Sequence, residues 1–278
     1  MRIGANLITN DITLSILEIA PLVEAAGLDS IFQGEHSHIP VDTIFPINSG
    51  VVPDFYKRFP DLFVTMAGAA AVTSTLRLGT GVVLPAEHQP LRLAKAVASL
   101  DVLAGGRVDF GVGYGWNAPE MANNGVDPKR RRTVFREHIE IISELWANDV
   151  VEHHGPQTTF TPSWSLPKPV QSQWRRPGPP ILIGAAAGPR TFADVLDLAD
   201  GWYPLTGPTF LDDAAELRRL AAERGVTIEI SGCEMAGQSG IPWYCDDAAA
   251  KVQLLDGVQR YADAGIDRLL IGVPVDSR

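Results

Sequence analysis

The chain alternates between short apolar runs rich in β-branched residues and longer segments with helical periodicity or many alanines. Several of the short runs are continuously apolar, which is typical of strands covered on both faces of a parallel sheet. We expect eight strands, over residues 2–7, 30–34, 76–84, 107–112, 180–184, 201–204, 226–233 and 268–273. Eight strand-then-helix units in one chain predict an α/β fold, the (β/α)8 or TIM barrel.

Helix boundaries are predicted from capping residues, from Pro in a first turn and from Gly after a last turn. These residues are Pro90 and Gly105 around one helix, Asp127 and Pro128 before a second, Gly188 and Pro189 before a third, and Asp246 and Gly265 around the last. Pro21 lies inside the apolar-periodic segment 12–26, and we expect it to kink or divide that helix.

Two segments depart from this rhythm, one over 38–60 after the second strand and one over 150–179 before the fifth. Loops of this length in a compact domain are usually functional or disordered, and aromatic residues favour order. The aromatics are Phe45, Phe55, Tyr56, Phe160, Trp164 and Trp174. We expect two ordered insertions that enclose a small-molecule substrate, on a single barrel domain spanning residues 1–278.

Charge and composition narrow the class of protein. The chain has 33 acidic and 23 basic residues, a net charge of −10, which disfavours a nucleic-acid partner. Its apolar stretches are far shorter than the ~20 residues of a membrane helix, and its first residues turn polar too soon for a signal peptide, so we expect a cytoplasmic protein. Cys233 and Cys245 have no zinc or disulfide spacing, and we expect two reduced, packed thiols.

Active sites of TIM barrels lie at the carboxyl ends of the strands. After the fifth strand, small side chains precede a helix N-terminus and a cation, a combination that suits a phosphate. These residues are Ala185, Ala186, Ala187, Gly188, Pro189 and Arg190. An ordinary strand-to-helix turn is the alternative.

The basic run 129–132 could contact the anionic tail of a ligand, although such runs are more often a solvated face.

The glycine-rich segment after the fourth strand does not match a dinucleotide fingerprint, because Trp116 stands where the third glycine is required. Glycines at the end of a strand, such as Gly113, let a flat ring lie against the backbone, and Asn117 could hydrogen-bond the edge of that ring. A flexible turn is the alternative.

Histidines offer two kinds of chemistry. His36 and His38 form an H-x-H pair, but only His88 among the other histidines lies near a strand end, so we expect no metal. His36 beside Glu35 is the better candidate for acid–base catalysis, since histidine titrates near neutral pH and an adjacent carboxylate raises its pKa.

Together these segments resemble the luciferase-like monooxygenase superfamily, and within it the branch that uses the 8-hydroxy-5-deazaflavin coenzyme F-420. The matching segments follow one another along nearly the whole chain, at 24–30, 34–36, 76–82, 93–95, 103–107, 111–117, 166–171, 183–185 with 188–190, and 200–202. The resemblance implies a homodimeric oxidoreductase that transfers a hydride between coenzyme F-420 and an organic substrate. An FMN-dependent monooxygenase, a cofactor-binding protein without activity and a metal-dependent hydrolase are the alternatives.

The resemblance also implies where the cofactor binds. It places Glu35 and His36 beside the ring, and a backbone bulge, often with a non-proline cis peptide, around Thr80, Gly81 and Val82. Trp116 stands where some family members have a proton-donating glutamate, which leaves His36 as the donor. The full set of expected cofactor-binding residues is Glu35, His36, Thr80, Gly81, Val82, Gly113, Trp116, Asn117, Ala185, Ala186, Ala187, Gly188, Pro189 and Arg190, with His36 and Glu35 also catalytic.

Overall fold

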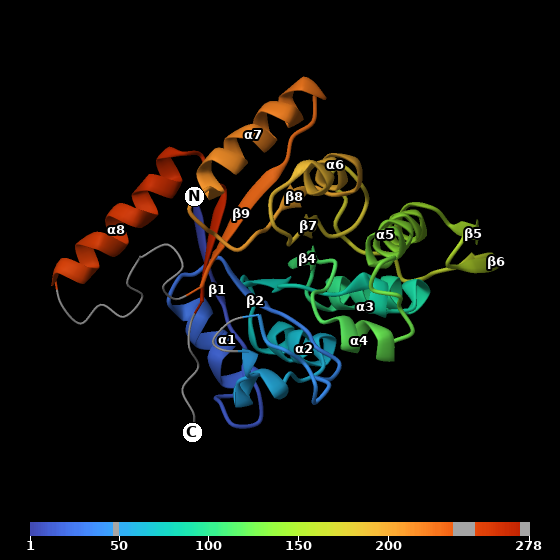
Figure 1. Ribbon diagram of the computed structural model, residues 1–278, viewed down its shortest axis with the longest axis horizontal. Coiled ribbons are helices and arrows are strands. Elements are labelled where there is room, and N and C mark those ends of the chain that lie inside the picture. Colours follow the sequence, from blue (N-terminus) through green and yellow to red (C-terminus); the bar gives the residue numbers. More distant parts are fainter. Residues whose placement is uncertain (47–49, 236–247, 273–278) are drawn as a thin grey trace.

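Eight parallel strands close into a barrel in the computed structural model, which describes residues 1–46, 50–235 and 248–272 (Figure 1). The strands are β1 Arg2–Asn6, β2 Ser30–Gln33, β3 Arg77–Thr80, β4 Val108–Val112, β7 Ile181–Ile183, β8 Gly201–Trp202, β9 Glu229–Glu234 and β10 Arg268–Gly272. Around the barrel they follow the order β1-β10-β9-β8-β7-β4-β3-β2. The (β/α)8 barrel and all eight strands of the sequence analysis are therefore confirmed, most of them shorter than expected.

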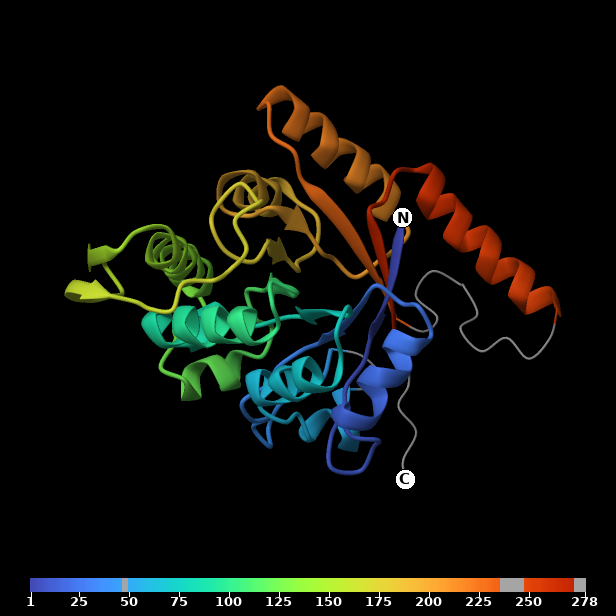
Figure 2. The same cartoon turned by 180° about the vertical axis from the view of Figure 1, so that it is seen from behind.

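Helices lie around the outside of the barrel in both views (Figures 1 and 2). They are α1 Ile16–Ala25, α2 Leu62–Val72, α3 Pro90–Leu103, α4 Ala118–Asn123, α5 Arg131–Ala147, α6 Pro189–Leu198, α7 Phe210–Glu223 and α8 Ala248–Asp263, with 3-10 turns η2 Asp54–Lys57 and η3 Pro85–Glu87. Helix α1 contacts α2, α2 contacts α3, and α3 contacts α5. Within the described ranges, no helix is both long and apolar enough to cross a bilayer.

One expected helix boundary is wrong, and one helix is not divided. Asp127 does not cap α5, because its carboxylate accepts the backbone N–H of Lys129 at 2.9 Å and closes a separate turn before the helix. Pro21 does not divide α1, which continues through it. A proline inside a helix removes only one backbone hydrogen bond, because its nitrogen carries no hydrogen. The first turn of α1 is also stabilised by a capping box, in which Ser15 and Glu18 bond each other. The expected cap Asp246 lies outside the described residues.

The second insertion contains an antiparallel hairpin, β5 Val150–His154 and β6 Thr159–Trp164, that lies beside α5 away from the barrel (Figures 1 and 2). Its aromatics do not enclose the mouth of the barrel, contrary to expectation. Trp164 is largely exposed, and Trp174 lies beside Arg2 and Asp200 at the amino-terminal ends of the strands. The reason is topological: a segment between a helix and the next strand returns to the amino-terminal face.

The amino-terminal half of the barrel interior holds a buried ion network. The Nη1 atom of Arg268 on β10 lies 2.6 Å from Oδ2 of Asp109 on β4, and both side chains have no exposed surface. These two strands stand opposite each other in the closed barrel. Arg77 on β3 also donates to Asp109. Although burial opposes the charged carboxylate, Arg268 and Arg77 lower the pKa of Asp109.

The carboxyl-terminal half of the interior is apolar. It consists of Phe32, Leu182, Tyr203, Cys233 and Leu270, with Val82 and Met235 packed against them. Gly79 makes room for this layer, because a Cβ atom there would lie 2.2 Å from the ring of Phe32. Cys233 is a buried free thiol as expected, and burial raises its pKa to about 12, so it stays protonated. Cys245 lies outside the described residues.

We expect Asp109→Asn to lower the free energy of unfolding by about 3–5 kcal/mol, because the buried guanidinium of Arg268 loses its counter-charge. Urea unfolding followed by circular dichroism measures this loss. The same substitution at Asp54, which forms an exposed ion pair with Arg58, is the control and should change stability little. Equal losses in the two variants would contradict a central role for the buried pair.

The same pair predicts a pH dependence. Because the pKa of Asp109 is lower in the folded than in the unfolded state, its stabilising contribution is present above about pH 4, the unfolded value, and is lost as the pH falls through the folded value. The stability difference between the native chain and Asp109→Asn should therefore shrink in acid. A difference that stays constant from neutral pH down to the acid transition would contradict this assignment.

Candidate functional site

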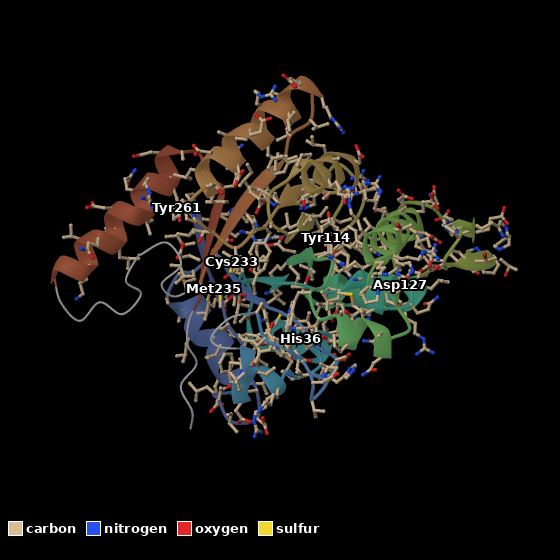
Figure 3. The ribbon with its side chains drawn as sticks, viewed as in Figure 1. His36, Tyr114, Asp127, Cys233, Met235 and Tyr261 are labelled. Atoms are coloured by element: carbon tan, nitrogen blue, oxygen red, sulfur yellow. The ribbon has the colours of Figure 1, made fainter. Side chains whose placement is uncertain are left out.

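The loops at the carboxyl ends of the strands bring the expected site residues to one face of the barrel. His36 follows β2, Val82 follows β3 and Trp116 follows β4. Figure 3 shows Cys233 and Met235 side by side at the end of β9, with His36 on the α2 and α4 side of the mouth. The apolar half of the barrel interior therefore forms the floor of the candidate site.

His36 is held by hydrogen bonds at both ring nitrogens. Its Nδ1 lies 2.6 Å from Oε2 of Glu120, and its Nε2 lies 2.9 Å from the hydroxyl of Tyr56. Glu120 is fully buried, and its carboxylate also faces the backbone N–H of Ser37 at 3.0 Å and the amide of Asn117 at 3.4 Å. A carboxylate only accepts hydrogen bonds, so Nδ1–H donates to Glu120, and whenever the ring is neutral its Nε2 accepts from the hydroxyl of Tyr56.

Glu35 does not pair with His36, contrary to the sequence analysis. Its Oε1 accepts the backbone N–H of Leu84 at 2.8 Å and lies 2.8 Å from Nε2 of His88. Although burial works against the charged imidazole, the hydrogen bond that His88 donates to Glu35 raises the pKa of His88. Successive residues after a strand point to different sides, so the two members of the expected pair serve separate clusters.

Glu120 is a candidate site residue that sequence reasoning missed. It lies in the first turn of α4, three positions after the N-cap Asn117, and α4 begins where the chain leaves β4. A search for acidic residues in the first turn of each helix that starts at the barrel mouth would have found it.

The H-x-H pair does not converge on a common point. The ring of His38 bonds Ser37 and Asn123, each at 2.9 Å, whereas His36 bonds Glu120 and Tyr56. In the part of the chain that the structure describes, no three His, Cys, Asp or Glu side chains come together as a metal-binding group.

Aromatic rings surround His36. Its ring centroid lies 5.0 Å from that of Tyr56, 5.1 Å from Phe59 and 5.7 Å from Trp116, and Phe45 contacts both Tyr56 and Trp116. Burial raises the pKa of Tyr56, so its hydroxyl stays neutral and can donate to His36. The first insertion therefore shields the imidazole from bulk water, with Trp116 still partly exposed. That this insertion also encloses a substrate stays a prediction.

The backbone after β3 has the feature that the resemblance implied, a cis peptide between Gly81 and Val82. Thr80 itself is buried and donates its hydroxyl to the carbonyl of Gly111 at 2.6 Å. A Cβ atom at Gly111 would lie 1.9 Å from the carbonyl oxygen of Thr80, and one at Gly113 would lie 2.7 Å from Val82. The glycines after β4 therefore let this backbone pack tightly, while Gly81 and Val82 remain half-buried at the mouth.

Asn117 is not available to a ligand in the way expected. It is buried, its amide faces Glu120, and its Oδ1 accepts the hydroxyl of Thr43 at 3.3 Å. The residue instead fixes Glu120 in place and links it to the first insertion.

The loop after β7 leads directly into α6, as expected. Ala186, Ala187, Pro189 and Arg190 are exposed, and the carbonyl of Ala185 accepts the indole N–H of Trp202 at 2.9 Å. The first N–H groups of α6 have no partner within the helix. An exposed arginine beside these groups makes the loop suited to an anion.

The basic run 129–132, which leads into the first turn of α5, contributes one structural residue. Arg132 bonds the buried Asp194 of α6 at 2.7 and 2.9 Å and the carbonyl of Arg190 at 2.8 Å. Tyr114 also donates to Asp194, at 2.6 Å, and Arg136 pairs with the same carboxylate. Arg132 therefore joins α5 to α6 and supports the loop after β7, and Arg190 keeps its own side chain exposed.

One buried polar atom at the mouth lacks a partner. The amide nitrogen of Asn6, at the end of β1, faces the sulfur atoms of Cys233 at 3.4 Å and Met235 at 3.5 Å, and Oδ1 of Asn6 has no hydrogen bond from any described residue. Burial of an unpaired acceptor is costly, and a ligand N–H would remove that cost. Asn6 was not among the expected site residues, although its position at a strand end pointed to it.

The model of the luciferase-like monooxygenase family matches residues 10–266. An uncharacterised protein of Mycobacterium tuberculosis, Rv0953c, is 36% identical over 99% of this chain and 92% of its own length. The oxygenase component of a flavin-dependent trigonelline monooxygenase of Acinetobacter baylyi is 31% identical over 61% of this chain and 42% of its own.

Among solved structures, an F-420-dependent secondary alcohol dehydrogenase in complex with an F-420-acetone adduct superposes with a TM-score of 0.73. It is 17% identical, over 100% of this chain and 95% of the other, a likeness that concerns the fold alone. The match of the family model over nearly the whole chain and the identity with the mycobacterial relative lead to one conclusion: the chain belongs to the luciferase-like monooxygenase family.

Proposed function

We propose that this member of the family is an oxidoreductase that transfers a hydride between coenzyme F-420 and a small organic substrate, with His36 handling the accompanying proton. The observation that carries the proposal is the pairing of His36 with the buried carboxylate of Glu120 at the barrel mouth, 2.6 Å apart. An imidazole held in this way can take up a proton on Nε2 and return it.

The residues at the mouth fit a ring with a ribityl phosphate tail. The apolar floor of Tyr203 and Cys233 suits a flat ring, and the unpartnered Oδ1 of Asn6 suits an N–H group on such a ring. The exposed start of α6 with Arg190 suits the phosphate. When bound there, the deazaflavin supplies a hydride acceptor or donor.

His36 takes up and releases the proton at its Nε2 atom. Oxidation of a carbinol releases one hydride and one proton, and the proton from the substrate oxygen goes to Nε2 of His36, directly or through the hydroxyl of Tyr56. The negative charge of Glu120 stabilises the resulting imidazolium. Phe59 and Trp116 keep water from this exchange. Reduction of a carbonyl group runs through the same steps in reverse.

A proton carrier at the mouth suits hydride transfer, because hydride transfer between a carbinol and a carbonyl always moves one proton as well. FMN with oxygen, as in a monooxygenase, is the alternative on the same scaffold, since the two cofactors share ring, ribityl chain and phosphate. The flavin-dependent relative at 31% identity supports this alternative.

We further propose an oligomeric state and a cellular compartment for the protein. We propose a homodimer, because two-fold dimers are the commonest closed assembly, and light scattering on the purified protein measures it. The cytoplasm is the proposed compartment, in keeping with the free thiol of Cys233.

Titration of the purified protein with oxidised coenzyme F-420 and separately with FMN, followed by cofactor fluorescence, tests the proposal. We expect F-420 to bind more tightly, and Arg190→Ala to weaken its binding about tenfold, because a charge-assisted hydrogen bond contributes about 1.5–3 kcal/mol and 1.4 kcal/mol is tenfold. The control Arg219→Ala removes an exposed guanidinium on α7 that pairs with Glu216 and Glu223, and should leave binding unchanged.

Preferential binding of FMN would move the assignment to a flavin monooxygenase. Binding of neither cofactor would contradict the cofactor site at the loop after β7.

His36→Asn should slow the reduction of F-420 by alcohols, or the oxidation of reduced F-420 by carbonyl compounds, by about 10²–10⁴-fold, the usual contribution of a general acid or base. The affinity for F-420 should change much less. The matched control is His38→Asn, since the ring of His38 bonds Ser37 and Asn123 outside the mouth. Stopped-flow absorbance of the cofactor measures both, and comparable losses in the two variants would remove His36 from the mechanism.

A further inference from the structure

Glu87 lies at the end of η3, behind the barrel mouth, and borders two cavities. The inner cavity, of about 100 Å³, is also bordered by His36 and Glu120. The outer pocket, of about 570 Å³, extends over α5 to the turn of the hairpin. Glu87, His88 and Asn124 border both. These three side chains therefore form the wall between the surroundings of His36 and a pocket on the flank of the barrel.

A continuous series of hydrogen bonds joins Glu87 to His36. Oε2 of Glu87 accepts the amide N–H of Asn124 at 2.7 Å, and the same amide lies 3.2 Å from the hydroxyl of Ser37. The backbone N–H of Ser37 donates to Oε1 of Glu120 at 3.0 Å, and Oε2 of Glu120 accepts from His36 at 2.6 Å. The two carboxylates therefore belong to one polar cluster.

Glu87 keeps one carboxyl oxygen without a hydrogen bond from any described residue. This buried atom is Oε1. A cavity of about 100 Å³ has room for several water molecules, and such waters can pass a proton between the carboxyl group of Glu87, which borders the cavity, and the His36–Glu120 pair.

The charges around Glu87 keep it able to titrate near neutral pH. The groups that face it from the packed elements are Glu35, His36, Asp61, His88 and Glu120 around the inner cavity, and Asp127, Arg130 and His138 around the outer pocket. Burial, followed by the negative charges of Glu120 and Glu35, raises the pKa of Glu87 to about 7. Both protonation states are therefore populated at neutral pH.

We propose that Glu87 carries protons between the solvent of the outer pocket and the His36–Glu120 pair. The protonated carboxyl group gives its proton through the inner cavity to the pair, becomes a carboxylate, and takes a new proton from water in the outer pocket. When the reaction releases a proton, the transfer runs outward. Glu87 does not touch the substrate itself and acts only through His36. Its role in turnover therefore rests on the proposed function.

Exchange of the His36 ring proton with water, measured by NMR on the full chain labelled with 15N-histidine and without cofactor, tests the proposal. Glu87→Gln keeps an oxygen that accepts from Asn124 but removes the titrating proton. We expect exchange in this variant to slow at least about tenfold at neutral pH and to lose its inflection near pH 7. Added imidazole buffer should restore the rate. The control Glu152→Gln alters an exposed carboxylate on the hairpin and should leave exchange unchanged.

Unchanged exchange in Glu87→Gln between pH 6 and 8 would overturn the proposal. Glu87→Asp separates relay from structure, because it keeps a carboxyl group and should retain exchange within about fivefold of the native rate. Equal losses in both variants without rescue by buffer would mean that Glu87 is only structural. Because the measurement needs no cofactor, failure of F-420 to bind leaves its result intact, and a negative result here leaves the cofactor assignment intact.

Discussion

The barrel depends on one buried ion pair, between Arg268 on β10 and Asp109 on β4, which joins opposite walls across the interior. Two charges without access to water must neutralise each other, so this contact fixes the amino-terminal half of the interior as polar and closely held. The carboxyl-terminal half of the interior then needs no charged side chains to neutralise that pair. Phe32, Leu182 and Tyr203 fill it instead. An apolar floor at the mouth is therefore a consequence of where the ion network lies.

The candidate site is organised by a second buried carboxylate, that of Glu120. It accepts hydrogen bonds from His36 and from the backbone of Ser37, and Asn117 supports it from the start of the same helix. Because a buried carboxylate needs several donors, its position also fixes the residues that supply them. The loop after β2, the first insertion and α4 are thereby held together around one imidazole, and the aromatic rings of the insertion complete the enclosure.

Patterns that are local in sequence were sufficient for the fold. Apolar runs gave the eight strands, and Pro90 and Pro189 marked the helices that they begin. The site was predictable only in part. His36 could be identified because it follows a strand, whereas its partner Glu120 is 84 residues away, and no periodicity encodes a contact of that kind. Trp174 was placed wrongly because composition shows that an insertion is aromatic but not which end of the barrel it reaches.

The flank of the barrel explains how a closed mouth can still exchange protons. A flat ligand on the apolar floor would cover the side of His36 that faces the mouth, and the rings of Tyr56 and Phe59 already cover another. The remaining side of the imidazole borders the inner cavity, together with Glu120 and Glu87. A proton that enters or leaves along this side does not compete with the substrate for space. The mouth can stay dry during rapid proton exchange only if protons and substrate use separate routes. The positions of the two cavities on the flank of the barrel allow such a separate route for protons.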